Sequence, residues 1–490
     1  MSVRNNTKSL LMAFGAAMAL AGCGNGADSV VSPGAGAFPP APAPAPPPPP
    51  PPPPTTPPPA AGPAENCPAG LTNIGTVANG TLRACQLPSR ITGNLVLSKL
   101  AGVAYAISGQ TVVGDDMGGD AAAPVAGAQK GTLTIDPGVV LYGSAGADFV
   151  LVNRGSQMFA VGTKDQPITF TSRAGLEGGN TADSIGQWGG IILMGRAPIN
   201  NCQGAVTPGT AACQALVEGA NNAFYGGNAA NDNSGRLSYV RVLYSGYKIA
   251  ENNELQALTL AGAGNATVID HFQSYNSSDD GIEIFGGTVN LNHIVINGAD
   301  DDGLDTDTGW NGATQFGIVV QRAGGGDRGT EQSNAGGSSK TPVSTPRVAN
   351  YTFVGRDGGG VGLMLNTGTN SAFYNTIVTG FSKGCLDIDD TGTNGTFHSV
   401  FFSCPKAFDD DADGVAAAKF AAGTNNTANG TSTLTGVFIN GANESAVPAY
   451  GNLAGAHPFF QQVSYIGAVK DSADTWWQGW TCGLTADKPC

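Results

Sequence analysis

The sequence predicts an all-β fold, a right-handed parallel β-helix with coils of about 22 residues. Short apolar runs are separated by Gly, Asn, Asp and Ser turns, and glycine is abundant at 73 residues. Helical patterning is scarce. The strongest observation is a repeat, because Ser278–Glu283 and Asp300–Asp305 read nearly alike with their glycines 22 residues apart. A period in this range indicates a solenoid in which each repeat is one coil.

The N-terminal residues are typical of a targeting segment. Arg4 and Lys8 form a basic start, and an apolar run too short to span a bilayer follows at residues 10–20. Leu20-Ala21-Gly22-Cys23 resembles a bacterial lipobox, which implies cleavage before Cys23 and lipidation of that cysteine. Residue 24 is glycine, not aspartate, so the inner-membrane retention signal known for such lipoproteins is missing. We therefore expect a lipid-anchored protein of the outer membrane, facing the cell surface or the periplasm.

The composition of the chain divides it into five segments. Residues 39–63 are almost all Pro, Ala and Thr, and such a segment forms an extended polyproline spacer with no core. The predicted segments are a signal peptide (1–22), the lipidated Cys23 with a Pro-rich stalk (23–66), an N-terminal cap (67–130), the β-helix (131–470) and a C-terminal cap (471–490).

The eight cysteines other than Cys23 favour an oxidising compartment. Eight cysteines permit 105 connectivities, and local pairing is favoured because each neighbouring pair closes a short loop. The sequence has no CxxC motif, so a zinc or redox site has little support. The predicted disulfides are Cys67–Cys85, Cys202–Cys213, Cys385–Cys404 and Cys482–Cys490.

Strands are expected wherever short apolar runs lie between turns, and three inserts interrupt the coils. The clearest runs are 132–135, 139–142, 149–152, 168–171, 191–194 and 240–244. The inserts are expected near residue 207, at 222–233 and at 324–345. The nearest approach to a helix is the Ala-rich stretch at 414–420.

Alternation along the strands predicts which side chains enter the core. The repeat places Phe272, Ile294 and Phe316 in one inward column. A second column, His271, His293 and Gln315, faces outward. The histidines form either a metal pair or a polar column exposed to solvent.

The two acidic repeats place carboxylates directly above one another. Asp279 lies under Asp301, Asp280 under Asp302, and Glu283 under Asp305, because neighbouring strands are about 4.8 Å apart. Two bare carboxylates about 5 Å apart repel by roughly 3 kcal/mol at an effective dielectric near 20. A divalent cation, retained protons or capping of turn amides would each relieve this repulsion. The candidate Ca²⁺ ligands are Asp279, Asp280, Glu283, Asp301, Asp302, Asp305 and Asp307.

A second, weaker calcium candidate follows in the sequence. Asp409, Asp411 and Asp413 match the opening of an EF-hand loop, D-x-D-x-D-G. The twelfth position is Phe420, so the usual bidentate Glu is missing. A solvated acidic turn is the alternative. The sequence suggests no organic cofactor.

Several stretches of the chain occur in a characteristic order. They are 131–138, 167–172, 188–195, 234–241, the two acidic repeats with 285–289, 309–310, 465–468 and 476–480. Together they resemble a largely uncharacterised family of bacterial right-handed parallel β-helix surface lipoproteins. The resemblance covers about residues 131–480, and it implies the fold and a cell-surface protein, sometimes found beside TonB-dependent transporters.

Two classes of function remain. The first is a surface lipoprotein that binds a glycan or nutrient ligand, with a divalent cation, or that has a structural role; Phe285, Trp310 and Tyr244 are expected as exposed aromatics. The second is a calcium-dependent polysaccharide lyase or a glycoside hydrolase. A lyase needs a basic residue near the calcium, and Arg241, Lys248 and Arg322 are the cations available. The net charge of −14 and the scattered basic residues argue against nucleic acid.

Overall fold

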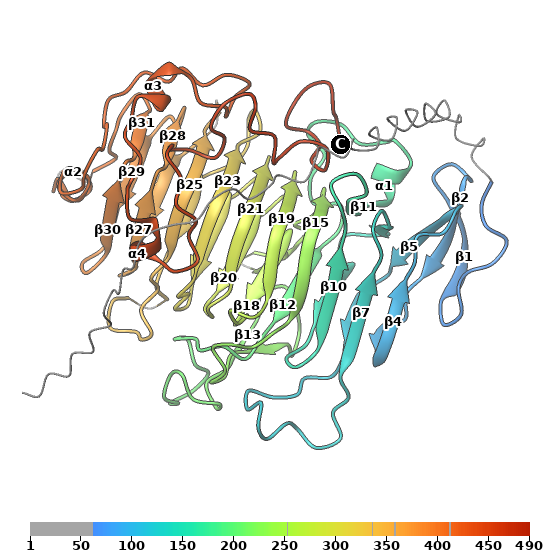
Figure 1. Cartoon of the computed structure of the whole chain (residues 1–490). Helices are drawn as coiled ribbons and strands as arrows, with labels where there is room; N and C mark the ends of the chain where they lie inside the picture. Colours follow the sequence, from blue (N-terminus) through green and yellow to red (C-terminus); the bar gives the residue numbers. More distant parts are fainter. Residues whose placement is uncertain (1–61, 252, 336, 357–358, 411–412) are drawn as a thin grey trace, which may run out of the picture. The chain divides into compact units, whose positions relative to one another are not determined.

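Parallel strands of successive coils form the two large sheets of the described chain (Figure 1). The computed structural model describes residues 62–490 except 252, 336, 357–358 and 411–412. The predicted signal peptide, Cys23 and nearly all of the stalk lie outside the described residues. Within them, every strand pairing of the two large sheets is parallel except β1 with β2. The predicted parallel β-helix is confirmed.

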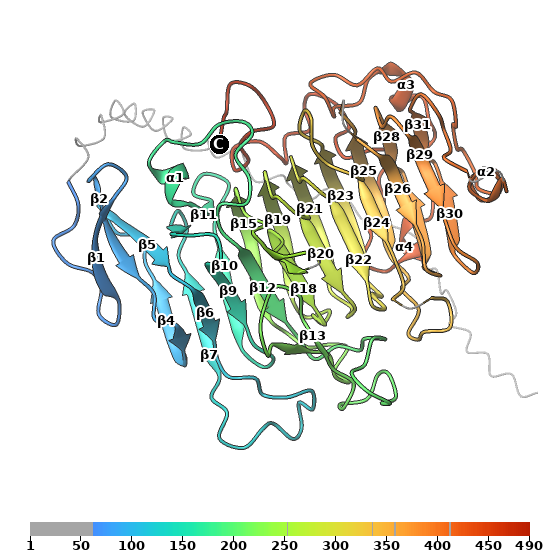
Figure 2. The same ribbon diagram turned by 180° about the vertical axis from the view of Figure 1, so that it is seen from behind.

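Sheet B is the 10-stranded sheet, best seen in Figure 2. Each coil contributes one short strand to it, and neighbouring strands come from successive coils. Its strands are β3 (Arg90–Ile91), β6 (Gln110–Val113), β9 (Phe149–Val152), β12 (Gly190–Met194), β18 (Leu258–Ala261), β20 (Ile282–Phe285), β22 (Leu304–Asp307), β24 (Thr330–Gln332), β26 (Val361–Leu365) and β29 (Gly384–Ile388).

Sheet A is the 17-stranded sheet, and it faces the viewer in Figure 1. Its strands are β1 (Thr72–Val77), β2 (Leu82–Gln86), β4 (Gly93–Leu97), β5 (Val103–Ile107), β7 (Gly131–Ile135), β8 (Val140–Gly143), β10 (Gln157–Val161), β11 (Ile168–Ser172), β15 (Gly235–Leu243), β19 (Val268–Tyr275), β21 (Asn290–Asn297), β23 (Ala313–Val320), β25 (Arg347–Val354), β27 (Asn370–Tyr374), β28 (Ile377–Thr379), β30 (Asn394–His398) and β31 (Phe401–Ser403).

A bend runs across the middle of sheet A, so each coil has three faces. The long strands β15 to β25 each contain one residue with positive φ, for example His271 at 56° and His293 at 53°. In other coils the bend separates two short strands; β15 pairs with β10 before Tyr239 and with β11 after it. A left-handed residue at this point turns the backbone and carries its side chain outward.

The core fills the interior of the coils. Phe272, Ile294, Ile282, Ile284 and Leu304 are fully buried and belong to one cluster that extends through the whole solenoid. The inward positions of Phe272 and Ile294 were predicted from the alternation of side chains. Burial of each large apolar side chain contributes about 1.5–3 kcal/mol to the stability of the fold.

On the third coil of the repeat, strand β23 is shifted by one residue from the predicted register. Ile294 pairs with Gly317, not with Phe316, because the coil from β21 to β23 is one residue longer than the coil before it. Phe316 is therefore the bend residue, with φ of 62°. The outward column is His271, His293 and Phe316, and the prediction of Gln315 there was wrong.

Among the described residues, two inserted hairpins and four short helices extend from the coils. The hairpins are β13 (Ala215–Leu216) with β14 (Phe224–Tyr225), and β16 (Lys248–Ala250) with β17 (Asn253–Glu254). The helices are α1 (Arg173–Leu176), α2 (Val415–Ala421), α3 (Ala442–Ser445) and α4 (Leu453–Ala456). Helix α2 occupies the Ala-rich stretch and packs against the last coils.

A C-terminal strap, residues 432–484, runs back along the outer face of sheet A (Figure 1). Asparagine and glutamine side chains of the sheet hold its backbone. Gln315 bonds to Gln461 in both directions, at 2.8 and 2.7 Å, and Gln273 bonds likewise to Cys482, at 2.6 and 3.1 Å. Trp477 and Trp480 supply buried apolar contacts.

The structure divides the chain differently from the predicted boundaries. The segment expected as an N-terminal cap already belongs to the parallel sheets, since β4, β5 and β6 pair with β7, β8 and β9. At the other end the paired strands stop at Ser403, and the strap begins well before residue 471. Conversely, all four predicted disulfides are present.

Candidate functional site: an acidic cavity on sheet B

The two acidic repeats stack in the predicted register. Strands β20 and β22 pair in parallel, with Glu283 opposite Asp305 and Phe285 opposite Asp307. On the next coil Glu331 of β24 lies opposite Asp305. Three carboxylates therefore follow one another on the outer face of sheet B. We call Glu283, Asp305 and Glu331 the acidic column.

The acidic column forms the floor of a cavity of about 540 Å³. Ten of its thirteen lining residues are acidic, and Lys248 is the one cation among them. The two inserted hairpins add part of the wall. The lining residues are Glu218, Lys248, Glu254, Gln256, Ser278, Asp279, Asp280, Glu283, Asp300, Asp301, Asp302, Asp305 and Glu331.

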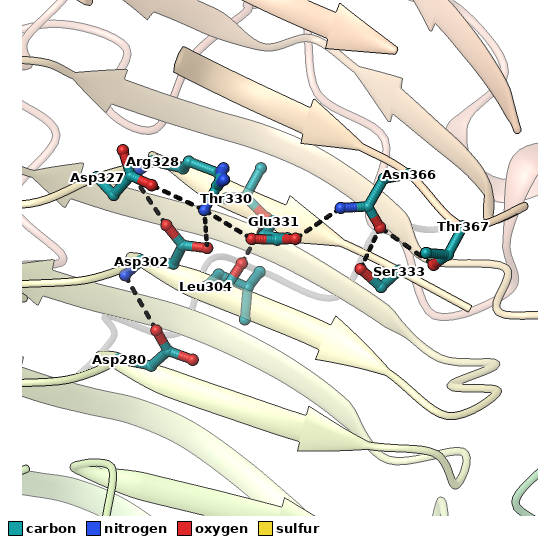
Figure 3. A network of polar contacts seen from close by, with 10 residues as sticks. All are labelled: Asp280, Asp302, Leu304, Asp327, Arg328, Thr330, Glu331, Ser333, Asn366 and Thr367. Carbon is teal, nitrogen blue, oxygen red and sulfur yellow. Dashed lines mark hydrogen bonds and ion pairs between the residues drawn. The ribbon is translucent and has the colours of Figure 1, made fainter. Parts of the chain in front are cut away.

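The aspartates of the turns are satisfied by backbone amides. The amide of Asp302 donates to Asp280 Oδ1 at 3.0 Å, and the amide of Arg328 donates to Asp302 Oδ1 at 2.8 Å (Figure 3). Each aspartate thus caps the turn of the next coil, which is one of the three outcomes that the sequence left open. Capping accounts for one oxygen of each carboxylate.

The first two carboxylates of the acidic column are not satisfied in this way. Glu283 is 6% exposed. Glu283 Oε2 and Asp305 Oδ1 are both buried without a hydrogen-bond partner. A buried charged oxygen without a partner is strongly unfavourable. These two atoms therefore need a proton or a cation.

Burial and crowding raise the pKa of the carboxyl groups in the cavity. The pKa of Asp279 rises to about 7, through burial first and then through the charge of Asp301. Burial also raises the pKa values of Asp280, Glu283, Asp302 and Asp305, and the charges of neighbouring carboxylates raise them further. Without a cation, these groups bind a proton more tightly than free carboxyl groups do.

The carboxylate oxygens are close enough to share metal ions. Three groups have ligand atoms within 4.8 Å of one another. An all-oxygen donor set of this kind suits Ca²⁺ better than a transition metal. The groups are Asp279 with Asp280 and Asp301, Asp280 with Glu283 and Asp305, and Asp301 with Asp302 and Asp327.

Six of the seven predicted ligands come together in the cavity, and Asp307 does not line it. Asp307 Oδ1 instead accepts a hydrogen bond from the amide of Ala335 at 2.6 Å. In the second candidate loop, Asp409 forms an ion pair with Lys406 at 3.0 Å, and Asp413 caps α2 through the amide of Val415. Asp411 lies outside the described residues.

The two histidines belong to a different environment. Tyr239, His271, His293 and Phe316 stack on one another along the bend of sheet A, with ring centroids 4.3, 4.3 and 5.1 Å apart. We call these four residues the aromatic column. Asp270 Oδ1 lies 3.0 Å from Nδ1 of both histidines, and Trp476 and Trp480 of the strap cover the rings.

The expected exposed aromatics are not exposed. Trp310 is fully buried in the core and Tyr244 is 4% exposed. Phe285 packs against Tyr225 of the first hairpin, with ring centroids 5.9 Å apart. Tyr247, beside the cavity residue Lys248, is 37% exposed.

Sequence reasoning missed three acidic residues of the cavity lining, Glu218, Glu254 and Glu331, and the neighbouring Arg328. Glu331 and Arg328 follow a coil of 26 residues rather than 22, so a strict repeat does not align them with Asp305 and Asp302. Glu218 and Glu254 come from the hairpins, whose position over sheet B has no counterpart in the repeat. A search that allowed insertions between coils would have found Glu331.

Residues 117–481 match the family model described as a pectate-lyase-like β-helix domain. The chain belongs to this family. A search of curated proteins found no match. In the described part of this pectate-lyase-like β-helix, no helix is long and apolar enough to cross a membrane.

Proposed function

We propose that this pectate-lyase-like β-helix binds a divalent cation, Ca²⁺ in the first place, in the acidic cavity, and that the bound cation holds a glycan or nutrient ligand. The observation that carries the proposal is the pair of buried, unpartnered oxygens of Glu283 and Asp305. Proton retention satisfies those oxygens at low pH, whereas a cation satisfies them at neutral pH.

A cation also explains the architecture of the cavity. Ten carboxylates around one lysine give a strongly negative potential that attracts cations and repels a bare anionic ligand. A bound Ca²⁺ keeps open coordination positions for ligand oxygens, since it takes 6–8 oxygens. Hydroxyl and carboxylate groups of a glycan supply such oxygens.

The test is the stability of the mature domain in CaCl₂ and in EDTA. Calcium at 100 times its Kd stabilises the folded state by about 2.7 kcal/mol. We expect a higher melting temperature in calcium for the wild type, and loss of that difference in Glu283→Gln and Asp305→Asn. The matched control is Asp307→Asn, on the same strand but outside the cavity, which keeps the difference. Equal melting temperatures of the wild type in the two buffers would refute cation binding.

The second candidate is a calcium-dependent polysaccharide lyase or a glycoside hydrolase. Membership of the family and the raised pKa values of paired carboxyl groups favour it, because a protonated acid beside a carboxylate suits general acid catalysis. Against the lyase, Lys248 is paired with Glu254 at 2.9 Å, so the cavity lining has no unpaired lysine or arginine.

Incubation with acidic polysaccharides and calcium separates binding from catalysis. Ultraviolet absorbance of unsaturated products and release of reducing ends detect a lyase and a hydrolase. We expect retention of the polysaccharide on immobilised protein without either signal. Turnover that Glu283→Gln abolishes would establish the enzyme instead.

The proposed location follows from the sequence alone. We propose that Cys23 carries lipid and anchors the domain to the outer membrane, with a TonB-dependent transporter as a candidate partner. Labelled palmitate should enter the wild type and not Cys23→Ser, and protease added to intact cells should report which side the domain faces. Unlabelled wild type would refute the anchor.

A further inference from the structure

A cation that belongs to the protein lies beside one end of the acidic cavity, where it contacts two of the lining carboxylates. Arg328 Nη1 lies 2.8 Å from Asp327 Oδ2, 2.8 Å from Glu331 Oε2 and 3.7 Å from Asp302 Oδ2 (Figure 3). The guanidinium therefore contacts two of the three carboxylates in the group formed by Asp301, Asp302 and Asp327. Its positive charge offsets part of the negative charge at this end of the cavity.

The position of Arg328 is fixed by the coil itself. Its amide donates to Asp302 Oδ1 at 2.8 Å, just as the amide of Asp302 donates to Asp280 Oδ1. Arg328 thus follows Asp280 and Asp302 in the same column of turn residues, one coil further on. A positive side chain replaces the third carboxylate of that column.

The acidic column shows the same change from one end to the other. Glu331 is satisfied on both oxygens, because Oε2 pairs with Arg328 and Oε1 accepts from Asn366 Nδ2 at 2.6 Å. Glu283, two coils away, has a buried oxygen without a partner. Side chains of the protein therefore satisfy the carboxylate of Glu331, whereas one carboxylate oxygen of Glu283 has no partner in the protein.

We propose that Arg328 is a built-in cation that fills the Asp302–Asp327 end of the cavity and confines exchangeable Ca²⁺ to the Glu283–Asp305 end. This inference rests on the proposed function and deepens it, because it assigns the number and place of the exchangeable ions. Removal of the guanidinium leaves three carboxylates within 4.8 Å of one another with no internal counter-ion, and that is a second site for a hard cation.

The experiment counts bound calcium by equilibrium dialysis of the folded domain at neutral pH. We expect Arg328→Gln to bind one more Ca²⁺ per chain than the wild type. The matched control is Arg322→Gln, which removes the same charge from an ion pair with Asp300 without touching the Asp301–Asp302–Asp327 group. It keeps the wild-type count. Arg328→Lys retains a positive charge and also keeps it.

The outcomes test the role of Arg328 and calcium binding at Glu283 and Asp305 separately. An unchanged count in Arg328→Gln, with calcium bound to the wild type, overturns the role of Arg328 alone. Calcium bound only to Arg328→Gln supports that role and refutes the site at Glu283. No calcium on either protein overturns both. Circular dichroism checks folding; if Arg328→Gln unfolds in EDTA and folds in CaCl₂, the ion replaces the guanidinium, and if it folds in neither, the inference fails.

Discussion

The aromatic column and the acidic column both stack similar side chains on successive coils, but the stacked rings attract one another and the stacked carboxylates repel. Tyr239, His271, His293 and Phe316 bury ring faces against one another, and the strap covers them with Trp476 and Trp480. Stacked rings attract, whereas stacked carboxylates repel by about 3 kcal/mol at 5 Å and an effective dielectric near 20. The acidic column relieves its repulsion internally only at Glu331.

The histidines also have a carboxylate of their own. Burial opposes ionisation of Asp270, but the hydrogen bond with His293 and the nearby ring of His271 outweigh it and hold the pKa of Asp270 below its usual range. In the cavity, burial and like charges act together and raise the pKa of Asp279 to about 7. The carboxyl groups beside the two columns thus lie in opposite electrostatic environments, and the raised pKa values give the cavity the character of a binding site.

The largest expected effect is the loss of stability when a tryptophan of the strap that covers the aromatic column is removed. Trp480 is fully buried and packs edge-on against Tyr239 and His271. We expect Trp480→Ala to lower the free energy of unfolding by about 3–5 kcal/mol, measured by urea denaturation. Val161→Ala, at an exposed position of sheet A, is the control and changes it by less than about 0.5 kcal/mol. A loss below about 1 kcal/mol would show that the strap is not part of the cooperative fold.

The second effect is a pH dependence of opposite sign for two carboxyl groups, Asp279 in the cavity and Asp270 beside the aromatic column. A raised pKa means that the folded state binds the proton more tightly, so the stabilisation from Asp279 is present at low pH and is lost as pH rises toward about 7. The lowered pKa of Asp270 stabilises the fold above the usual carboxyl pKa and is lost on acidification. In EDTA, a fully shifted carboxyl contributes a slope of about 1.4 kcal/mol per pH unit.

The variants Asp279→Asn and Asp270→Asn separate these two slopes. Between about pH 4 and pH 7, the stability of the wild type in EDTA should fall more steeply than that of Asp279→Asn. Asp270→Asn should instead lessen the loss of stability toward acid pH. Calcium should reduce the fall of the wild type as pH rises. Identical profiles for the wild type and Asp279→Asn would contradict the cause assigned to the raised pKa.

The sequence predicted the acidic column as far as the repeat stays regular. Glu283 and Asp305 were predicted because their coils are 22 residues apart, as the bond between Asp280 and Asp302 confirms. Glu331 was missed because a longer coil shifts it, and Phe316 was misplaced because one extra residue enters between β21 and β23. Local alternation fixes which side chains point inward, but insertions change the register without a local signal.

The sequence did not predict which segments pack over the two columns, namely the strap on sheet A and the hairpins beside the cavity. The strap lies on sheet A through contacts such as Gln273 with Cys482, which are 209 residues apart. Neither periodicity nor turn chemistry encodes a contact of that length. The same holds for Glu218 and Glu254, which hairpins bring to the cavity, and for the burial of Trp310, which was expected at the surface.

The smallest expected effect concerns the loop at residues 409–413, whose motif suggested calcium. Asp409 is paired with Lys406 at the surface, and an exposed ion pair contributes between about 0 and 1 kcal/mol. Asp409→Asn should therefore leave the stability within about 0.5 kcal/mol of the wild type and should preserve the calcium-dependent rise in melting temperature. Asp410→Ala should cost about 1 kcal/mol, because Asp410 caps α2 through the amides of Ala416 and Ala417. If Asp409→Asn abolished the calcium response while Glu283→Gln kept it, the binding site would be this loop, and the unpartnered oxygens of the acidic column would then be satisfied by protons.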